Sequence, residues 1–248
     1  MKISIITTTF NSEKTVAETL ESVLNQDYGD FEHIIVDGLS HDRTLEIVSS
    51  YESRYSGKLK IISEKDKGLY DAMNKGIKNA TGDIIGILNS DDVLATSNAL
   101  SLIAEKFKTE SCDAVYSDLM FMDEKTMSVP VRKWTSKFGN YKFGWHPPHP
   151  TLYIKKSVYD NIGSFNLDYK IAADYDFMLR LMKSGAKLAY IPETLIYMRA
   201  GGVSTDGLGG YLKNLKEAHL VLKNNNIKCP LLVDLIRIAK TLFQFINK

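Results

Sequence analysis

The chain of 248 residues lacks several features that would fix its class at once. Its two cysteines, Cys112 and Cys229, are too few for a disulfide framework and match no zinc-ligand spacing, so a reducing cytoplasm is the natural compartment. The net charge of +1 excludes the strongly basic footprint of a nucleic-acid-binding domain, so we expect no nucleic-acid partner. No segment reaches the ~18 consecutive apolar residues of a membrane span. The N-terminal stretch also lacks the small-residue cleavage site of a signal peptide, which leaves a soluble or membrane-associated protein.

What is present is an ordinary globular composition, with 44% hydrophobic and 25% charged residues. A chain of this length can bury a large core as one domain or as one domain with appendages. The first half alternates short apolar segments with helical patterns. The expected strands are Ile3–Thr9, Phe31–Asp37, Leu59–Ser63, Gly82–Leu88 and Asp113–Tyr116. The expected helices are Ser12–Asn25, Asp42–Tyr51, Leu69–Ala80 and Ser97–Lys108.

This alternation predicts βαβ units and therefore an α/β fold with a mostly parallel, Rossmann-like central sheet flanked by helices. In such sheets ligands bind at the carboxyl ends of the strands, near a topological switch point. Polar side chains follow several of the predicted strands, which indicates a binding cleft there. The residues at these ends are Thr7, Thr8, Thr9, Asn11, Asp37, Glu64, Asp66, Asp91 and Asp92.

The second half has a different pattern, with few helix signals in residues 118–150. We expect a strand at Thr151–Ile154, helices at Lys156–Ile162 and Ala172–Ser184, and strands near Lys187–Ile191 and Thr194–Arg199. A cluster of glycines in residues 200–210 indicates a mobile loop. We therefore expect one domain over residues 1–205, with a nucleotide-type half (1–118) and a smaller acceptor-side half (119–205). Residues 206–248 are expected to form a C-terminal helical extension.

Two adjacent acids, Asp91 and Asp92, directly follow the predicted buried strand that ends at Leu88. Adjacent carboxylates repel unless a cation or a donor network compensates them. One interpretation is a site for Mg²⁺ or Mn²⁺, which prefer oxygen ligands and bind through one or two carboxylates plus substrate phosphates. The other is an N-cap of the next helix. Ser97 and Asn98 could supply that cap instead, which favours the metal site.

Three further positions carry weaker signals. Asp37 could accept hydrogen bonds from a ribose or a base, or could form a turn with the glycine that follows it. Asp174 could act as a general base or simply complement a helix dipole. His149 lies in a proline-rich loop with His146, and its spacing does not distinguish metal, phosphate or acceptor binding from a surface position. No G-x-G-x-x-G or Walker A loop is present.

The ordered set of motifs resembles the family 2 glycosyltransferases of the GT-A fold, and is most similar to those that build bacterial surface polysaccharides. The motifs are ISIITTTFN, VDGLSHDRT, SEKDKGLYDAMNKGIKNATGDIIGILNSDD and HPTLYIKKSVYDNIGSFNLDYKIAADYDFMLRL. The resemblance covers roughly residues 1–205. It implies a GT-A domain that binds a nucleotide-sugar.

The resemblance also implies roles for individual residues. Positions that match the base- and ribose-binding residues are Thr8, Phe10 and Asp37. Positions in the donor pocket are Lys67, Gly68 and Asn74. The pair Asp91-Asp92 stands for the D-x-D motif, with Asp92 as the metal ligand and Asp91 nearer the ribose. Asp174 matches the catalytic base, although Ala173 replaces the glutamate that usually precedes it, and Asp176 is the fallback base. His149 and Asp176 are also candidates for contact with acceptor or phosphate.

The activity that the resemblance implies is an inverting, metal-dependent transfer with Mn²⁺ or Mg²⁺ as cofactor. The donor would be a UDP-sugar, and the acceptor a hydroxyl of a glycan or of a polyprenyl-diphosphate-linked sugar. The product would belong to an O-antigen, a capsule or an exopolysaccharide, and the loop 200–210 would close over the donor. The alternatives are a sugar-nucleotide nucleotidyltransferase and a non-catalytic nucleotide-sugar-binding module. A glycoside hydrolase is disfavoured because a second acid near Asp174 is missing.

The segment Leu231–Ile246 predicts a helix with a polar stripe and an unusually wide apolar arc. The helix could lie on an anionic membrane. It could instead pack on its own domain or on a second subunit as a homodimer. We therefore expect a cytoplasmic protein, with peripheral attachment to the inner face of the membrane as an open alternative.

Overall fold

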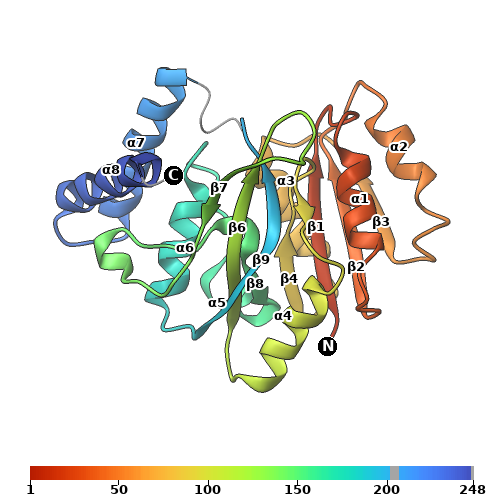
Figure 1. Cartoon of the computed structure of the whole chain (residues 1–248), viewed down its shortest axis with the longest axis horizontal. Coiled ribbons are helices and arrows are strands. Elements are labelled where there is room, and N and C mark those ends of the chain that lie inside the picture. The colour runs from red at the N-terminus through yellow and green to blue at the C-terminus, as the bar shows by residue number, and fades with distance from the viewer. Residues whose placement is uncertain (202–206, 247–248) are drawn as a thin grey trace.

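The structure is a computed structural model that describes residues 1–201 and 207–246. Its described strands form one nine-stranded sheet in the order β3-β2-β1-β4-β8-β6-β9-β5, with β7 also paired to β6 (Figure 1). The first strands are β1 (Ile3–Thr9), β2 (Phe31–Asp37), β3 (Leu59–Ser63) and β4 (Ile84–Ile87). All four are parallel, which confirms the predicted parallel sheet.

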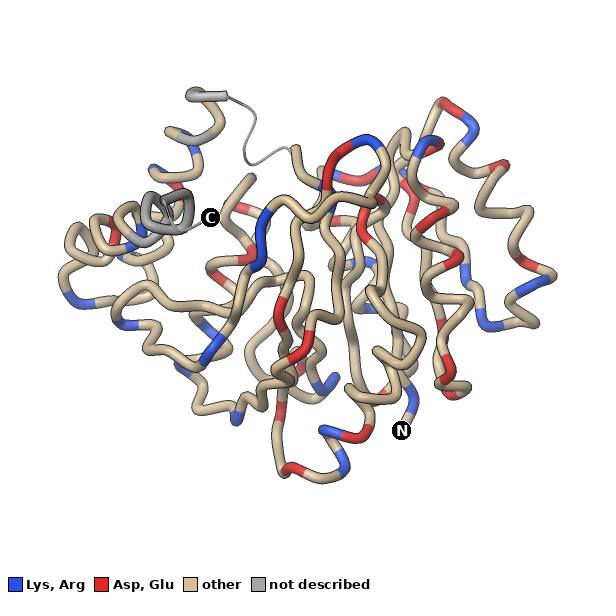
Figure 2. The backbone as a smooth tube through the Cα atoms, viewed as in Figure 1, with Lys and Arg blue, Asp and Glu red and all other residues tan. Residues whose placement is uncertain are grey.

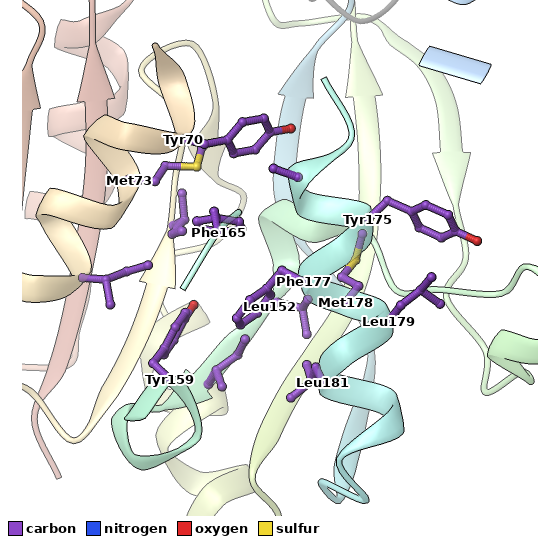
Figure 3. Packing of buried hydrophobic residues seen from close by; sticks show 14 of the residues in the cluster. Tyr70, Met73, Leu152, Tyr159, Phe165, Tyr175, Phe177, Met178, Leu179 and Leu181 are labelled. Carbon is purple, nitrogen blue, oxygen red and sulfur yellow. The ribbon is translucent and has the colours of Figure 1, made fainter. Parts of the chain in front are cut away.

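β1, β2 and β4 are buried on both faces, because helices cover both sides of this sheet. Ile3 and Ile5 pack in one core with α1 (Val16–Leu24), α2 (Thr44–Ser50) and α4 (Ala99–Thr109). Ile6 points to the opposite face and packs in a second core. That core joins α3 (Leu69–Asn79), α5 (Lys156–Ile162), α6 (Ala173–Lys183) and α7 (Gly207–Asn224) (Figure 3). The expected α/β architecture, a central sheet flanked by helices, is thereby confirmed.

The second half continues the same sheet. β8 (Tyr153–Lys155) runs antiparallel between β4 and β6 (Ala114–Met122), and β6 is parallel to β9 (Leu188–Arg199). The two strands expected within 187–199 are therefore one strand with register shifts. Two short strands were not predicted: β5 (Val93–Leu94), which pairs with β9, and β7 (Pro130–Trp134), which pairs with β6. One sheet runs through both expected halves of the domain. Their division at residue 118 therefore stays a prediction.

The C-terminal segment forms two helices, α7 and α8 (Pro230–Ile246). The expected glycine-rich loop 200–210 is wrong in its last part, because Gly207, Gly209 and Gly210 lie in the first turn of α7. Residues 202–206 of that loop lie outside the described residues. Two short 3₁₀ helices, Tyr141–Phe143 and His149–Thr151, lie in the region that gave few signals.

Candidate active site

The ends of β1, β2 and β3 bring distant polar residues together along one edge of the sheet, called here the carboxyl edge. Thr9 is in register with Asp37, and Asp37 with Ser63. Asp37 is fully buried and accepts four hydrogen bonds: from the hydroxyls of Thr9 (3.0 Å), Ser40 (2.5 Å) and Ser63 (3.0 Å), and from the Ser40 N–H (3.0 Å). Its carboxylate therefore fixes the three strand ends. A contact with a base or ribose requires one of these donors to yield.

An exposed aromatic ring and an acid lie next to Gly38, which directly follows Asp37. Phe10 directly follows β1 and is 61% exposed. A Cβ on Gly38 would collide with the carboxylate of Asp66 and would come within 3.5 Å of the Phe10 ring, so these three residues are adjacent. The hydroxyl of Thr8 is buried without a hydrogen-bond partner. An exposed ring next to acceptors and an unpaired hydroxyl offers stacking and hydrogen bonding to a flat heterocycle.

The start of α3 forms the neighbouring part of the carboxyl edge. Gly68 is its N-cap, with φ of 119°, a conformation that a side chain would strain. The N–H of Gly68 donates to Asp66 (2.8 Å), and the N–H of Lys67 donates to Asp71 (2.9 Å). The side chain of Lys67 is exposed at this helix N-terminus, where an anion would be favoured.

The two acids after β4 occupy different environments. Asp92 is buried, and its oxygens accept from the side-chain amide of Asn89 (2.8 Å) and from the N–H of Arg199 at the end of β9 (3.2 Å). Asp91 remains partly exposed. The strand β5 follows directly, so neither acid caps α4, whose N-cap is Asn98. The structure therefore removes the N-cap interpretation.

The electrostatics of this pair suit a divalent cation. Burial raises the pKa of Asp91, and burial together with the charge of Asp91 raises the pKa of Asp92. The nearest cation, Arg199, lowers both pKa values only in part, and its guanidinium is paired with Glu18 (2.6 Å). Because burial makes the ionised forms of these two acids unfavourable, a metal ion that binds beside them would stabilise their charged carboxylates.

The protein alone supplies an incomplete metal site. Within the part of the chain that the structure describes, no three His, Cys, Asp or Glu side chains are grouped to hold an ion. Because both oxygens of Asp92 are already hydrogen-bonded, Asp91 is the better placed of the two for an ion. One carboxylate with water and substrate phosphates is a usual Mg²⁺ arrangement. The residues present therefore fit a metal that binds together with a diphosphate.

The candidate base Asp174 lies in the first turn of α6 and is half-buried. Its Oδ1 accepts from the N–H of Tyr175 (2.7 Å) and lies 3.3 Å from the hydroxyl of Tyr70 in α3. Figure 3 shows the Tyr70 ring extending from α3 toward the start of α6. Tyr70 was not among the predicted site residues, because only the fold brings residues 70 and 174 together.

His149 also lies near Asp174. Its ring packs against Phe165 with centroids 5.4 Å apart. Burial lowers the pKa of His149, and the charge of Asp174 opposes that shift. A largely neutral imidazole beside a carboxylate can donate to or accept from a hydroxyl. Its role toward acceptor or phosphate stays a prediction.

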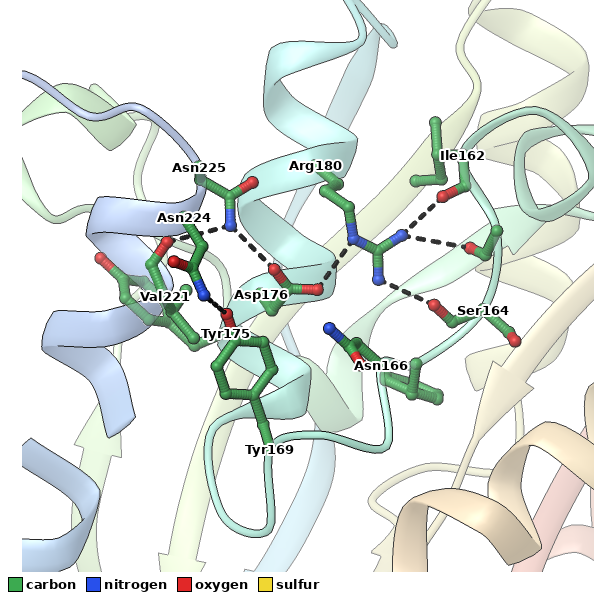
Figure 4. A network of polar contacts seen from close by, with 12 residues as sticks. Ile162, Ser164, Asn166, Tyr169, Tyr175, Asp176, Arg180, Val221, Asn224 and Asn225 are labelled. Atoms are coloured by element: carbon green, nitrogen blue, oxygen red, sulfur yellow. Dashed lines mark hydrogen bonds and ion pairs between the residues drawn. The ribbon is translucent and has the colours of Figure 1, made fainter. Parts of the chain in front are cut away.

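Asp176, the fallback base, has a structural environment instead. It is 5% exposed, and its oxygens accept from Arg180 (2.8 Å) and Asn225 (2.8 Å) (Figure 4). Arg180 also donates to the carbonyls of Ile162 and Ser164. Asp176 thus ties α6 to α7 and to the loop after α5. A role of Asp176 as fallback base or in contact with acceptor or phosphate stays a prediction; in the structure its two oxygens are engaged by Arg180 and Asn225.

Asn74 likewise serves the fold. Its amide donates to the carbonyl of Phe165 and its oxygen accepts the N–H of the same residue, both at 2.9 Å. It borders a cavity of about 390 Å³ between α3 and α5, together with Lys156 and Tyr159. The two hydrogen bonds from Asn74 to Phe165 hold the loop that precedes α6 against α3. The expected place of Asn74 in the donor pocket stays a prediction.

Comparison with known proteins now gives the class. Residues 4–170 match the model of glycosyl transferase family 2, so the chain belongs to this family and is a glycosyltransferase. A PGL/p-HBAD biosynthesis glycosyltransferase of Mycobacterium tuberculosis is 31% identical over 206 residues, which cover 81% of this chain and 78% of that protein. The putative glycosyltransferase EpsE of Bacillus subtilis is 27% identical and covers 98% and 88%.

Solved structures share the GT-A fold. The mannosyltransferase PcManGT of Pyrobaculum calidifontis, in complex with GDP-Man and Mn²⁺, has a TM-score of 0.70 at 16% identity. The match covers 96% of this chain and 70% of that one. S. aureus TarS, in complex with UDP-GlcNAc, has a TM-score of 0.69 at 22% identity and covers 89% and 65%.

Proposed function

We propose that the protein transfers a sugar from a UDP-sugar to an acceptor hydroxyl, with inversion at the anomeric carbon and with Mn²⁺ or Mg²⁺ as cofactor. The observation that carries this proposal is the 3.3 Å approach of Asp174 to the hydroxyl of Tyr70. Tyr70 follows Lys67 and Gly68 in the chain, so a carboxylate of the acceptor-side half lies at the start of the donor-side helix α3.

The donor is bound at the carboxyl edge. Phe10 stacks on the base. The base and the ribose are held by the unpaired Thr8 hydroxyl and by the Asp37 carboxylate with the hydroxyls bonded to it. Lys67, at the N-terminus of α3, is placed to contact the diphosphate. Neighbouring structures that contain UDP-GlcNAc or GDP-Man support a nucleotide-sugar donor for this fold.

Asp91 holds the metal ion in this account, and Asp92 anchors the loop that presents it. When bound, the ion offsets negative charge on the departing nucleotide diphosphate. This assignment reverses the order expected from the motif, for which Asp92 was the likelier ligand. The hydrogen bonds of Asp92 to Asn89 and Arg199 are the reason.

Asp174 acts as the general base. It takes the proton of the acceptor hydroxyl while that oxygen attacks the anomeric carbon from the face opposite the nucleotide. The bond between the anomeric carbon and the diphosphate oxygen breaks, and its electron pair leaves with the nucleotide. Burial raises the pKa of Tyr70 far above its ordinary value, so its hydroxyl stays protonated and remains a donor.

We propose a glycan or polyprenyl-diphosphate-linked acceptor and a cytoplasmic protein that contacts the membrane peripherally. No helix in the described part of the chain is long and apolar enough to span a bilayer. In α8, however, three leucines are exposed: Leu231 by 71%, Leu232 by 54% and Leu235 by 64%. The other face of α8 packs on the domain, where Arg237 lies over the Tyr175 ring at 4.0 Å.

The charges favour an anionic lipid surface. Residues 207–248 contain seven Lys and Arg but only two acids, and cations recur along α7 (Figure 2). Both acids are engaged inside the protein: Glu217 with the N–H groups before α6, and Asp234 with His219 (2.6 Å). Exposed leucines flanked by lysines are typical of an interfacial helix.

Two experiments test the proposed transfer reaction. A thermal-shift panel of sugar nucleotides, with and without Mn²⁺, identifies the donor, since a ligand of the folded state raises the melting temperature. NMR of the transferred sugar then gives its anomeric configuration. No shift with any sugar nucleotide, or retention of configuration, contradicts the proposal.

Flotation with phosphatidylglycerol vesicles, using the wild type and a Leu231→Ser, Leu232→Ser, Leu235→Ser variant, tests the membrane contact. A concentration-dependent dimer without flotation would assign the face to a second copy.

A further inference from the structure

Glu217 in α7 makes an unusual contact with the turn that precedes α6, the helix that carries Asp174. Its carboxylate accepts three successive backbone N–H groups: Lys170 (3.0 Å), Ile171 (2.8 Å) and Ala172 (3.0 Å). Successive N–H groups that converge in this way form a concave anion-binding nest. Here the anion is a side chain from a segment 45 residues further along the chain.

The turn has no side chain of its own to do this. The N-cap of α6 is Ala172, and no side chain caps this helix. Asp174 accepts the N–H of Tyr175 itself. Bonds of an N–H to a carboxylate are charge-assisted and stronger than neutral ones. Glu217 is therefore the principal restraint on the backbone that leads into Asp174.

The restrained turn is joined directly to the site. The hydroxyl of Tyr70 donates to the carbonyl of Ile171 (2.7 Å) and lies 3.3 Å from Asp174. Since Tyr70 has one proton, the shorter contact takes it, which leaves the carboxylate available to an acceptor hydroxyl. Hydrogen bonds thus run from Glu217 through the turn at Ile171 to Tyr70, whose hydroxyl lies 3.3 Å from Asp174.

We propose that Glu217 is a positioning residue for the base: it fixes the turn 170–172, and because this turn leads directly into α6, it holds the Asp174 carboxylate toward the acceptor. This inference rests on the proposed function. It extends the active site to α7, which lies beyond the residues that match the family model.

Glu217→Ala tests the inference. We expect kcat for transfer to fall on the order of tenfold to a hundredfold, as misplacement of a reacting group does. The KM for the donor should stay unchanged, because the hydrogen bonds of Glu217 go to the turn 170–172 and not to the residues assigned to the donor. Glu217→Gln keeps an oxygen acceptor and should restore most of the rate. The matched control is Asn224→Ala, which removes a bond from α7 to Tyr169 in the same loop (2.7 Å) and should leave kcat unchanged.

A double-mutant cycle adds a sharper test. Tyr70→Phe removes the other bond to the turn, so the Glu217→Ala, Tyr70→Phe double variant should lose less than the product of the two single losses. Hydrogen exchange at the amides of residues 170–172, measured without substrate, should lose protection in Glu217→Ala. Wild-type kcat in Glu217→Ala, or unchanged protection there, overturns the inference. Absence of transfer in the wild type itself would instead reject the proposed function, while hydrogen exchange still reports on Glu217.

Discussion

Asp174→Asn and Asp176→Asn separate chemistry from folding, because the two acids lie two residues apart on α6 in different environments. Asp174 is half-buried beside Tyr70, whereas Asp176 is 5% exposed and hydrogen-bonded to Arg180 and Asn225. We expect the first substitution to change the rate and the second to change the stability.

The magnitudes follow from these contacts. An asparagine at 176 keeps one acceptor oxygen, and its NH₂ group replaces the other. That NH₂ group would face either Arg180 or Asn225, which are both donors. Disrupting a buried ion pair in this way costs about 3 kcal/mol. For a chain of this size that lowers the melting temperature by roughly 6–12 °C. An asparagine at 174 still accepts the Tyr175 N–H, so stability should change by less than about 0.5 kcal/mol.

The rate effect has the opposite order. Loss of a general base lowers kcat by roughly 10²–10⁴, so Asp174→Asn should be nearly inactive with a wild-type melting temperature. Asp176→Asn should keep the wild-type kcat when transfer is measured below its melting temperature. Calorimetry and initial rates at 20 °C check both. An Asp176→Asn variant that melts like the wild type but fails to transfer would refute this division of roles.

Three other changes test single features. Phe10→Ala removes an exposed ring, so the dissociation constant for UDP should rise by roughly five- to thirtyfold, about 1–2 kcal/mol for a stacked base, with no change in melting temperature; unchanged affinity would exclude stacking. Asn74→Ala should lower the melting temperature by releasing Phe165 while UDP affinity measured by titration stays the same; the reverse result would place Asn74 in the donor pocket. Burial alone would raise the pKa of Glu32, but hydrogen bonds from Ser4, Thr81 and Lys2 outweigh it and hold the pKa at about 2, below the ordinary 4.5. Its stabilising effect is therefore present above the ordinary pKa and is lost as pH falls toward 2, so Glu32→Gln should destabilise at pH 7 and much less at pH 2.5 in thermal melts; an equal loss at both values would contradict this.

Local patterns predicted much of the fold, because β1, β2 and β4 are buried on both faces and their apolar runs alternate with amphipathic helices. The same patterns placed Thr8, Asp37 and Asp91 at strand ends, which lie at one edge of any parallel sheet. β5 has two residues and β7 begins at a proline, so neither carries a readable strand pattern. The glycines that open α7 indicated a loop, and packing of its later turns on α6 overrides that preference.

The site was less predictable because its decisive contacts are long-range. The spacing of Asp176 and Arg180 is visible in the sequence as an i, i+4 pair, but the bond from Asn225 is not. Burial of Asp92 depends on the N–H of Arg199, which is 107 residues away. The contact of Tyr70 with Asp174 spans 104 residues. No short-range pattern reports such pairs.

The most direct test of the central claim is calorimetric titration of UDP into the wild type and Asp91→Asn, each with and without Mn²⁺. The account predicts that Mn²⁺ strengthens UDP binding to the wild type and has little effect on Asp91→Asn, because Asp91 would hold the ion and the ion would offset the charge of the diphosphate. Equal UDP affinity in all four titrations would contradict it.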